Sequence, residues 1–551
     1  MSTGRLLLTH ARLAPQAGLS AILIDKGVFA AVVPQDSAGD LAAPGTTTVD
    51  LDGRTVLPGL HDSHLHAYEY GRSLLGVDLR GVASTADLTA RLAAARPEST
   101  GWIRGGGWDG TVLRGTGPDR GICAADIDNA TGGVPALLSD ITGHAALANT
   151  AALRAAGVDA STPDPDGGSF VRDAHGHPTG VILEAAVGRL NDAIPALTRA
   201  DRITALRLMQ DALLAQGIVA ITDPGLGPGA RTLMDGTGDL DAIAAYRDLD
   251  AAGDLHLRAH LMLLFGGLGG TSADDVVRGL DAWGPPAPAG PDSRVSVAQL
   301  KVFADGIPRS RTAWLREPYE DSCSHGHLQL AGDTDDEKVA QLRRIVAEAS
   351  ARGWQIGTHC TGDRTITEYL DAIQATGTGP ALRHYVIHGD LVVDDDLPRM
   401  AAMGTVLNTN PSIRWAIGHR VEPVLGRARN LRRQPLRTAI DTGVRVCSAS
   451  DAPVADPDWR RIMACAMTRA LSDDPDYCDA QALTAQEAVD SMTTGPAWQS
   501  REEDTRGRIA PGFGADLVVL DRAVDWARPW SLMEASVSAT VVDGDVVWGG
   551  L

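Results

Sequence analysis

Residues 56–66 read Val56-Leu57-Pro58-Gly59-Leu60-His61-Asp62-Ser63-His64-Leu65-His66. The stretch begins apolar, passes through Pro-Gly, and ends in two histidines that are one residue apart. In an extended strand, side chains at positions i and i+2 lie on the same face. We therefore expect His64 and His66 to project together and to hold a metal ion, and His61, which has the opposite parity, to point away. A strand end that merely carries polar residues is the alternative, and the later strands decide between the two.

The middle of the chain alternates strand-like apolar runs with amphipathic helical runs, which predicts a parallel α/β fold. Three of the helical runs are residues 202–214, 336–351 and 366–375. Eight runs are candidate barrel strands, namely residues 56–65, 218–223, 256–265, 297–304, 355–360, 384–389, 404–409 and 445–450. This number predicts a TIM-type (β/α)8 barrel, in which the active site lies at the C-terminal ends of the strands.

Short β segments occur near both ends of the chain, at Arg5–Leu13, Ala21–Val33, Thr46–Val56, Ala515–Leu520 and Ser538–Trp548. They predict a small β-sandwich domain built from both chain termini, residues 1–57 and 505–551, beside a barrel domain at 58–504. The segment 75–215, after the first barrel strand, is longer than any barrel connection requires. We expect it to be an insertion that covers the active site and shapes the substrate pocket.

Composition limits the classes of partner. The formal net charge of −21 argues against the phosphate backbone of a nucleic acid as partner. The 6 cysteines form no C-x-x-C pair, which suits a reducing compartment, and no apolar run approaches the ~20 residues of a membrane helix. We therefore expect a cytoplasmic protein with a small-molecule substrate and no nucleic-acid or membrane partner, while a homodimer stays open.

Lys301 is one of only three lysines, with Lys26 and Lys338, in a chain whose other cations are arginines. It lies inside an apolar strand, where an unpaired ammonium group would be costly. Burial lowers the pKa of a lysine, and the neutral amine can then react with CO₂ to give a carbamate, an anionic group that can bridge two metal ions. Arginine cannot do this. A lysine that snorkels or forms a salt bridge is the alternative.

His359, His388 and Asp451 each follow an apolar strand and precede glycine, proline or polar loop residues. Singly, each is more simply a capping or hydrogen-bonded structural residue. Together with His64 and His66, all at the C-terminal ends of strands of one barrel, they are hard to obtain by chance.

The set His64, His66, Lys301, His359, His388 and Asp451 resembles the amidohydrolase superfamily, and most closely its YtcJ-like branch (amidohydrolase family 3). The resemblance runs along essentially the whole chain. It includes Gly107-Trp108-Asp109, Gly143-His144, Pro318-Tyr319, Arg383-His384, Ser450-Asp451-Ala452-Pro453 and Gly514-Ala515-Asp516-Leu517.

The resemblance implies a barrel with a small β-sandwich from both termini and a binuclear zinc-type site. On this analogy His64, His66 and Asp451 bind the more buried ion, His359 and His388 bind the second, and carboxylated Lys301 bridges them. One or two divalent ions are expected, with Zn²⁺ favoured by the ligand types and Mn²⁺, Fe²⁺ or Ni²⁺ left open.

Such a site implies hydrolysis of a C–N bond in a small amide, formamide or related molecule by metal-activated hydroxide. Asp451 would act as general base and acid, taking the proton of the attacking water and delivering it to the leaving nitrogen. Deamination of an amidine or heterocycle by the same site is the alternative, and release of ammonia distinguishes it. A scaffold that has lost catalysis is a third reading, which the intact ligand set disfavours.

Five further residues are expected around this site. Asp305 and Asp363 would orient the metal ligands through hydrogen bonds. Trp108, His144 and Trp415 would line the substrate pocket. Each has a plain alternative as buried packing or loop anchoring.

Overall fold

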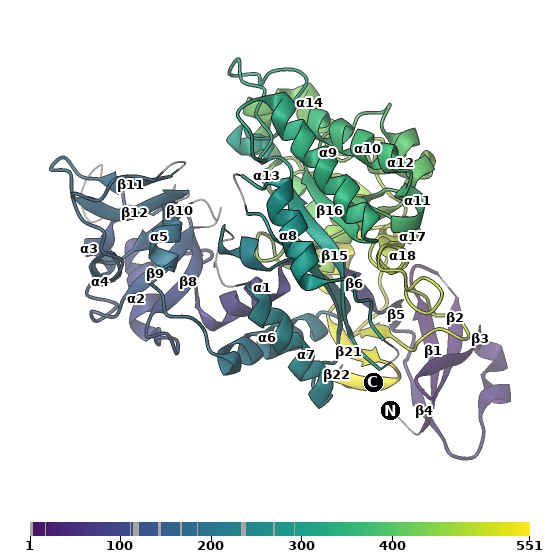
Figure 1. Ribbon diagram of the computed structural model, residues 1–551. Helices are drawn as coiled ribbons and strands as arrows, with labels where there is room; N and C mark the ends of the chain where they lie inside the picture. The colour runs from purple at the N-terminus through teal and green to yellow at the C-terminus, as the bar shows by residue number, and fades with distance from the viewer. Residues whose placement is uncertain are drawn as a thin grey trace. The chain divides into compact units, whose positions relative to one another are not determined.

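The computed structural model describes residues 4–16, 18–110, 112–113, 121–140, 145–165, 168–184, 186–232, 238–267, 270–290, 292–475 and 477–551 (Figure 1). The chain forms two compact units. The first comprises Met1–His66, Gln210–Gly225 and Leu249–Leu551, and the second comprises Ala67–Met209 and Leu226–Asp248. None of the helices in the described part of the chain has the length and hydropathy of a membrane-spanning helix.

The first unit contains a barrel of eight parallel strands, and each of the eight predicted runs contributes one. In spatial order they are β6 (Leu60–Asp62), β13 (Ile218–Leu226), β14 (Arg258–Leu263), β15 (Val295–Phe303), β16 (Gln355–Cys360), β17 (Tyr385–His388), β18 (Val406–Thr409) and β19 (Val446–Ser448). The register places Lys301 of β15 opposite Gly357 of β16. The predicted TIM-type barrel is confirmed.

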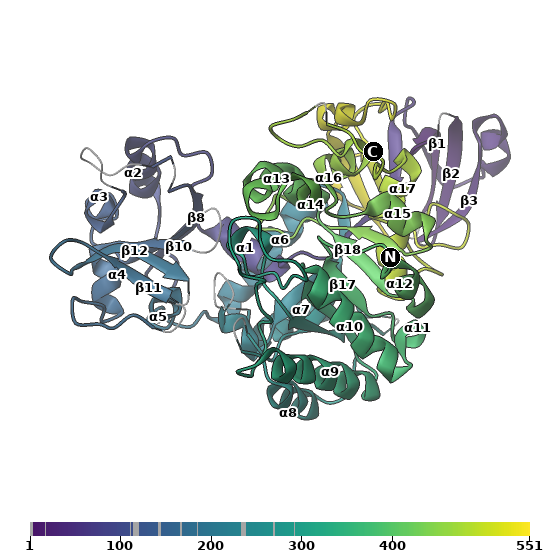
Figure 2. The same cartoon turned by 90° about the horizontal axis from the view of Figure 1, so that it is seen from above.

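Amphipathic helices follow the strands. They include α8 (Ala273–Trp283), α9 (Asp335–Ala351), α10 (Asp363–Thr376), α13 (Pro411–Leu425) and α16 (Trp459–Thr468). Helix α9 begins at a capping box, in which Thr334 and Glu337 each accept a bond from the backbone of the other. Its buried Leu342, Ile345 and Ala349 recur at helical spacing. Helix α8 packs against α9, and α9 packs against α10 (Figures 1 and 2).

The ring closes between its first and last strands, β6 and β19, through the residues that follow each of them. The backbone N–H of Asp451 donates to the carbonyl of His64 at 2.9 Å, and the N–H of His66 donates to the carbonyl of Ala452 at 3.0 Å. The N–H of Ser450 donates to the buried Asp62 carboxylate at 3.1 Å. These bonds hold the end of the eighth strand against the end of the first.

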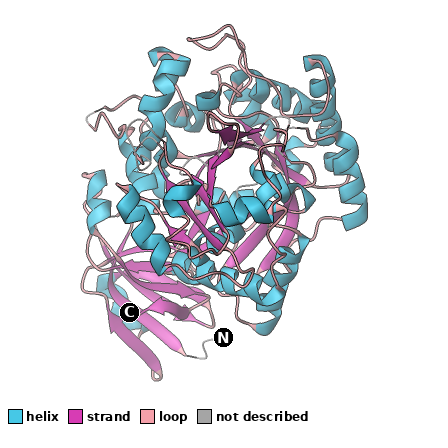
Figure 3. Cartoon of the chain, turned by 90° about the vertical axis from the view of Figure 1, so that its left-hand side faces the viewer, coloured by secondary structure: helices cyan, strands magenta, loops and turns pink. Residues whose placement is uncertain are grey.

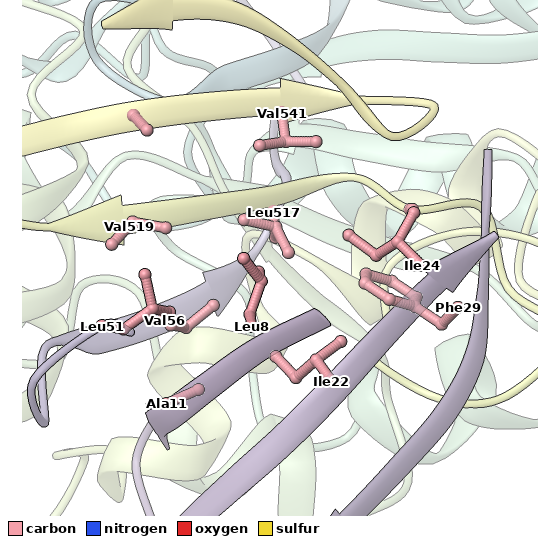
Figure 4. Packing of buried hydrophobic residues seen from close by; sticks show 12 residues of the cluster. Leu8, Ala11, Ile22, Ile24, Phe29, Leu51, Val56, Leu517, Val519 and Val541 are labelled. Atoms are coloured by element: carbon pink, nitrogen blue, oxygen red, sulfur yellow. The ribbon is translucent and has the colours of Figure 1, made fainter. Parts of the chain in front are cut away.

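Strands from both ends of the chain form one further sheet in this unit (Figure 3). Its strands are β1 (Arg5–Leu13), β2 (Leu19–Asp25), β3 (Val28–Pro34), β4 (Thr46–Asp50), β5 (Thr55–Pro58), β20 (Leu517–Leu520), β21 (Val537–Val542) and β22 (Asp545–Gly549). β5 pairs antiparallel with β20, which joins the two chain ends. Leu8, Ile22, Val56, Leu517 and Val541 share one buried cluster (Figure 4). Strands from both termini therefore share one sheet, as predicted, while a separate β-sandwich domain stays a prediction.

Three predicted strands were too long. The run 56–65 is divided at Gly59, because β5 belongs to the terminal sheet and β6 to the barrel. A Cβ on Gly59 would lie 2.5 Å from Cγ2 of Val219, so the crossing from sheet to barrel leaves no room for a side chain. The run 21–33 is the hairpin β2–β3, and the run 46–56 is β4 and β5; both turn at a residue with positive φ followed by glycine.

The second unit contains a six-stranded mixed sheet in the order β11-β12-β10-β9-β8-β7. Its strands are β7 (Val77–Asp78), β8 (Ile103–Trp108), β9 (Ala136–Asp140), β10 (Ala145–Ala148), β11 (Gly168–Arg172) and β12 (Pro178–Glu184). Adjacent residues Leu137 and Leu138 of β9 enter different hydrophobic clusters, so both faces of the sheet are covered. The predicted domain boundaries, and the covering of the active site by residues 75–215, stay predictions.

A buried ion network joins the terminal sheet to the start of the barrel strands. Arg258, the first residue of β14, donates to Asp516 at 2.8 Å and to Asp543 at 2.7 Å. Arg294 and Arg506 bind Asp543 as well. Asp516 belongs to the Gly514–Leu517 segment near the end of the chain, so that segment anchors the sheet to the barrel.

We predict that Arg258→Met lowers the free energy of unfolding by about 3 kcal/mol, because the substitution leaves the buried carboxylate of Asp516 and the half-buried carboxylate of Asp543 with fewer cations. The measurement is denaturant unfolding followed by circular dichroism. Arg278→Met is the matched control: Arg278 pairs with Asp275 on the exposed side of α8, where an ion pair contributes less than about 1 kcal/mol. Equal losses in the two variants would contradict the anchoring role.

Candidate metal centre

Six predicted ligands lie at or just beyond the C-terminal ends of barrel strands in the first unit. His64 and His66 follow β6, Asp451 follows β19, and His359 lies in β16. His388 is the last residue of β17, and Lys301 lies near the end of β15. His64, Lys301, His359 and Asp451 are buried, whereas His66 and His388 are half-buried. The parallel strands therefore bring residues from five points of the sequence to one end of the barrel.

His64, His66 and Asp451 form one close group, in which one ligand atom from each lies within 4.8 Å of the others. Oδ1 of Asp451 lies 3.3 Å from Nε2 of His64 and 3.5 Å from Nε2 of His66. The two histidines meet beyond the end of β6, so the turn of the chain and the closing bonds to Ala452 and Asp451 bring them together. The alternation of side chains along an extended strand, which the sequence analysis assumed, is not the reason that they lie together.

His388 and His359 continue this group. The ring centroids of His64 and His388 are 5.3 Å apart, and those of His388 and His359 are 4.4 Å apart. Lys301 lies close enough that its charge lowers the pKa of all four imidazoles. The structure thus gathers all six predicted ligands into one cluster.

The comparisons with known proteins agree with this arrangement. The model of the amidohydrolase family matches residues 47–548. The chain belongs to the amidohydrolase family. The predicted resemblance is therefore confirmed, and it extends from the terminal sheet through the barrel.

Two curated relatives cover nearly the whole chain. The putative amidohydrolase YtcJ of Bacillus subtilis is 29% identical over 520 residues, which are 92% of this chain and 91% of the relative. The N-substituted formamide deformylase of Arthrobacter pascens is 28% identical over 95% of this chain and 94% of its own. The crystal structure of an uncharacterized metal-dependent hydrolase from Pyrococcus horikoshii has a TM-score of 0.75 at 24% identity. The match covers 96% of this chain and 98% of the hydrolase chain, which shows that the two chains share a fold.

The chemical state of the cluster fits a divalent cation. Burial lowers the pKa of His66 to about 3 and those of His64 and His359 well below the ordinary value, so these imidazoles are neutral, as metal ligands must be. Burial also lowers the pKa of Lys301 to about 7, against the opposing effect of Asp451.

Buried polar atoms without a hydrogen-bond partner also indicate that the cluster fits a divalent cation. Nδ1 of His64 and Nζ of Lys301 are buried without a hydrogen-bond partner among the described residues. Each such atom costs about 1–3 kcal/mol in a folded protein. Imidazole nitrogens with a carboxylate are the donor set that Zn²⁺ and similar ions prefer.

Two residues of the cluster adopt a backbone conformation that disfavours side chains. His388 has φ 70° and Asp451 has φ 60°, both in the left-handed region. A non-glycine residue there costs about 1 kcal/mol or more, and such residues concentrate at functional sites. The backbone is strained at the two points where the sixth and eighth strands deliver their side chains.

Asn410, which the sequence analysis missed, orients His388. Its Nδ2 donates to the carbonyl of Ala449 at 3.0 Å, so its Oδ1 faces Nδ1 of His388 at 2.7 Å. An amide oxygen can only accept, so Nδ1 of neutral His388 carries the proton and Nε2 keeps its lone pair for a metal. The available signal was a polar residue directly after β18, the seventh strand.

Asp305 supports His359 indirectly. Its fully buried carboxylate accepts from the backbone N–H groups of Thr361 and Gly362 at 3.0 and 2.9 Å. It therefore fixes the loop directly after β16. His359 itself bonds through Nε2 to the carbonyl of Gly306 at 3.1 Å, which leaves its Nδ1 as the acceptor.

The other expected residues contribute differently. The carboxylate of Asp363 accepts from the backbone N–H groups of Arg316 and Arg364, so its bonds anchor a loop and not a ligand histidine. Trp108 is 3% exposed, packs inside a core of the second unit and donates to the carbonyl of Leu138, and its contact with substrate stays a prediction. Trp415 packs against Trp530, with their ring centroids 6.1 Å apart, and its contact with substrate stays a prediction. His144 lies outside the described residues.

His61 stands apart from the cluster. It bonds to Thr222 at 3.1 Å and stacks on His260 with ring centroids 5.2 Å apart. Its contacts therefore agree with the expectation that His61 is not a ligand.

We predict that the metal-free protein loses stability as the pH falls below about 6.5. The histidines of the cluster titrate near 6.5 when unfolded, and burial lowers their pKa values in the folded protein, to about 3 for His66. Between these values the unfolded chain binds more protons, so each histidine removes up to about 1.4 kcal/mol per pH unit. The measurement is the free energy of unfolding against pH in chelator.

The matched variant is His64→Asn/His66→Asn, which should show a shallower slope. Burial raises the pKa of Asp62 and Asp305 to about 7, and these groups titrate in the opposite sense. The comparison of slopes therefore isolates the histidines, and identical slopes would contradict their burial as neutral bases.

We also predict that Asn410→Leu weakens metal affinity about 10–100-fold, because His388 loses the acceptor that sets its tautomer. Asn410→Asp should retain most of the affinity, since a carboxylate still accepts from Nδ1. Competition with a chromophoric chelator measures both. Equal metal affinity in Asn410→Leu and the parent protein would contradict the role of Asn410 in orienting His388.

Proposed function

We propose that the chain is a metal-dependent hydrolase that cleaves a C–N bond in a small amide, formamide or related molecule. One observation carries the proposal: His64, His66 and Asp451 offer ligand atoms within 4.8 Å of one another, beside His359, His388 and Lys301. The amidohydrolase family supports hydrolysis as the reaction. The relative that is named N-substituted formamide deformylase supports formamides as the first class to test.

The metal would be held by the same six side chains. His64 and His66 with Asp451 would bind one ion, and His359 with His388 would bind a second, with Zn²⁺ favoured by the donor types. Such a cation acidifies a water molecule from a pKa of ~15.7 toward ~7 and polarises a carbonyl oxygen.

Asp451 is the residue proposed to move the proton. Its side chain is 11% exposed and lies within 3.5 Å of both histidines that follow β6. Its carboxylate would accept a proton from the attacking water and return it to the leaving nitrogen as the C–N bond breaks. The products are a carboxylic acid, which is formic acid for a formamide, and a neutral amine; the acid then releases its proton to solvent.

Lys301 is proposed to carry a carbamate. Burial lowers its pKa to about 7, so a large share of the amine is neutral near that pH. The amine nitrogen would form a bond to the carbon of CO₂ and lose a proton, which gives an anionic group with two ligand oxygens. This change would supply negative charge where the four imidazoles supply none.

We expect Asp451→Asn and Lys301→Arg each to lower kcat by at least about 100-fold while the fold is retained. An amide carries no ionised oxygen for the proton, and a guanidinium does not carbamylate. The measurement is turnover on a panel of formamides, amides and amidines, with formate, amine and ammonia each quantified and metal content determined in parallel.

The matched controls are Asp473→Asn at an exposed position and Lys338→Arg on α9, which should both retain full turnover. Ammonia as the product from an amidine or heterocycle would favour the deaminase instead. Near-normal turnover by purified Asp451→Asn or Lys301→Arg would overturn the proposed mechanism.

A further inference from the structure

Arginines mark the end of the barrel that lies opposite the metal cluster. Arg258 is the first residue of β14, Arg294 and Arg445 directly precede β15 and β19, and Arg383 lies two residues before β17. Since the strands are parallel, these four side chains start from the N-terminal end of the barrel. The whole chain carries a net charge of −21, so this local concentration of cations is a distinct feature.

A cavity of about 270 Å³ lies at this end. Its walls include Arg445, Arg506, Arg508, Trp498 and Glu503. A water molecule takes about 30 Å³ of liquid volume, so a small organic anion fits inside.

Two of the charged groups in the wall are already neutralised by ion pairs. Glu503 accepts from both terminal nitrogens of Arg383 at 2.7 and 3.0 Å. Arg506 binds Asp516 and Asp543, the carboxylates of the anchoring network. Neither group therefore adds a free charge to the cavity.

Arg445 and Arg508 are the remaining cations. Both are exposed, and neither lies within ion-pair distance of a carboxylate in the described part of the chain, although Arg383 and, at longer range, Arg445 both lower the pKa of Glu503. The guanidinium of Arg445 lies 4.6 Å from the Trp498 ring. Stacking uses the flat face of a guanidinium and leaves the N–H groups at its edge available to a ligand. Asp504 is the one remaining carboxylate in the wall, so the described lining carries an excess of positive charge.

We propose that this cavity binds a small dianion through Arg445 and Arg508. Paired N–H groups of arginine match two oxygens of a phosphate or a carboxylate, which gives short charge-assisted bonds. The ligand class is therefore a phosphate monoester or a dicarboxylate small enough for the cavity. The site is separate from the metal centre, and it does not depend on the proposed hydrolysis.

Isothermal titration calorimetry of the full-length protein with its bound metal tests the proposal, with inorganic phosphate and malonate as separate probes at low ionic strength. We expect a saturable site for at least one probe. Its affinity should fall at least tenfold in Arg445→Gln/Arg508→Gln and stay unchanged in Arg420→Gln. Arg420 is an exposed arginine on α13, so that variant controls for the loss of positive charge.

The two probes separate the two ligand types, since a site for phosphate monoesters prefers phosphate and a site for dicarboxylates prefers malonate. Binding of phosphate at the metal centre would persist in the double variant, so only the heat lost with Arg445 and Arg508 belongs to the cavity. Identical isotherms in all three proteins, or no saturable heat with either probe, would overturn the proposal.

Discussion

The structure depends on the hydrogen bonds that close the barrel between its first and eighth strands. The N–H of Asp451 donates to the His64 carbonyl at 2.9 Å, and the N–H of His66 donates to the Ala452 carbonyl at 3.0 Å. These bonds join residues that are almost 400 positions apart in the sequence. The same residues supply the closest ligand group, so the closure of the fold and the assembly of the site are one event. A barrel that did not close here would separate the carboxylate from both imidazoles.

Ionisable groups are buried in different ways at the two ends of the barrel. At the N-terminal end, Arg258 and its neighbours are paired with carboxylates of the terminal sheet, which stabilises the junction. At the C-terminal end, four buried or half-buried imidazoles and the buried Lys301 have lowered pKa values, and Asp451 is the carboxylate within reach. The ion pairs of Arg258 with Asp516 and Asp543 are complete without a ligand, whereas the metal cluster is stabilised when a cation binds.

Much of this could be predicted from sequence because the barrel strands are apolar runs and several of them end at or next to a polar residue. That pattern located all eight strands and all six gathered residues. It could not divide the run at Gly59, because the reason is the approach of Val219 from a distant strand. Asn410 was missed because its role depends on a hydrogen bond to His388, a contact between distant positions that no local pattern reveals.

The most direct test of the account is the anomalous scattering from a crystal of the purified protein, measured at the absorption edges of the candidate metals. The account predicts a peak about 2.0–2.2 Å from ligand atoms of His64, His66 and Asp451, with any second peak at His359 and His388. A metal-loaded, active protein with no peak at these residues, or with its metal bound elsewhere, would contradict it.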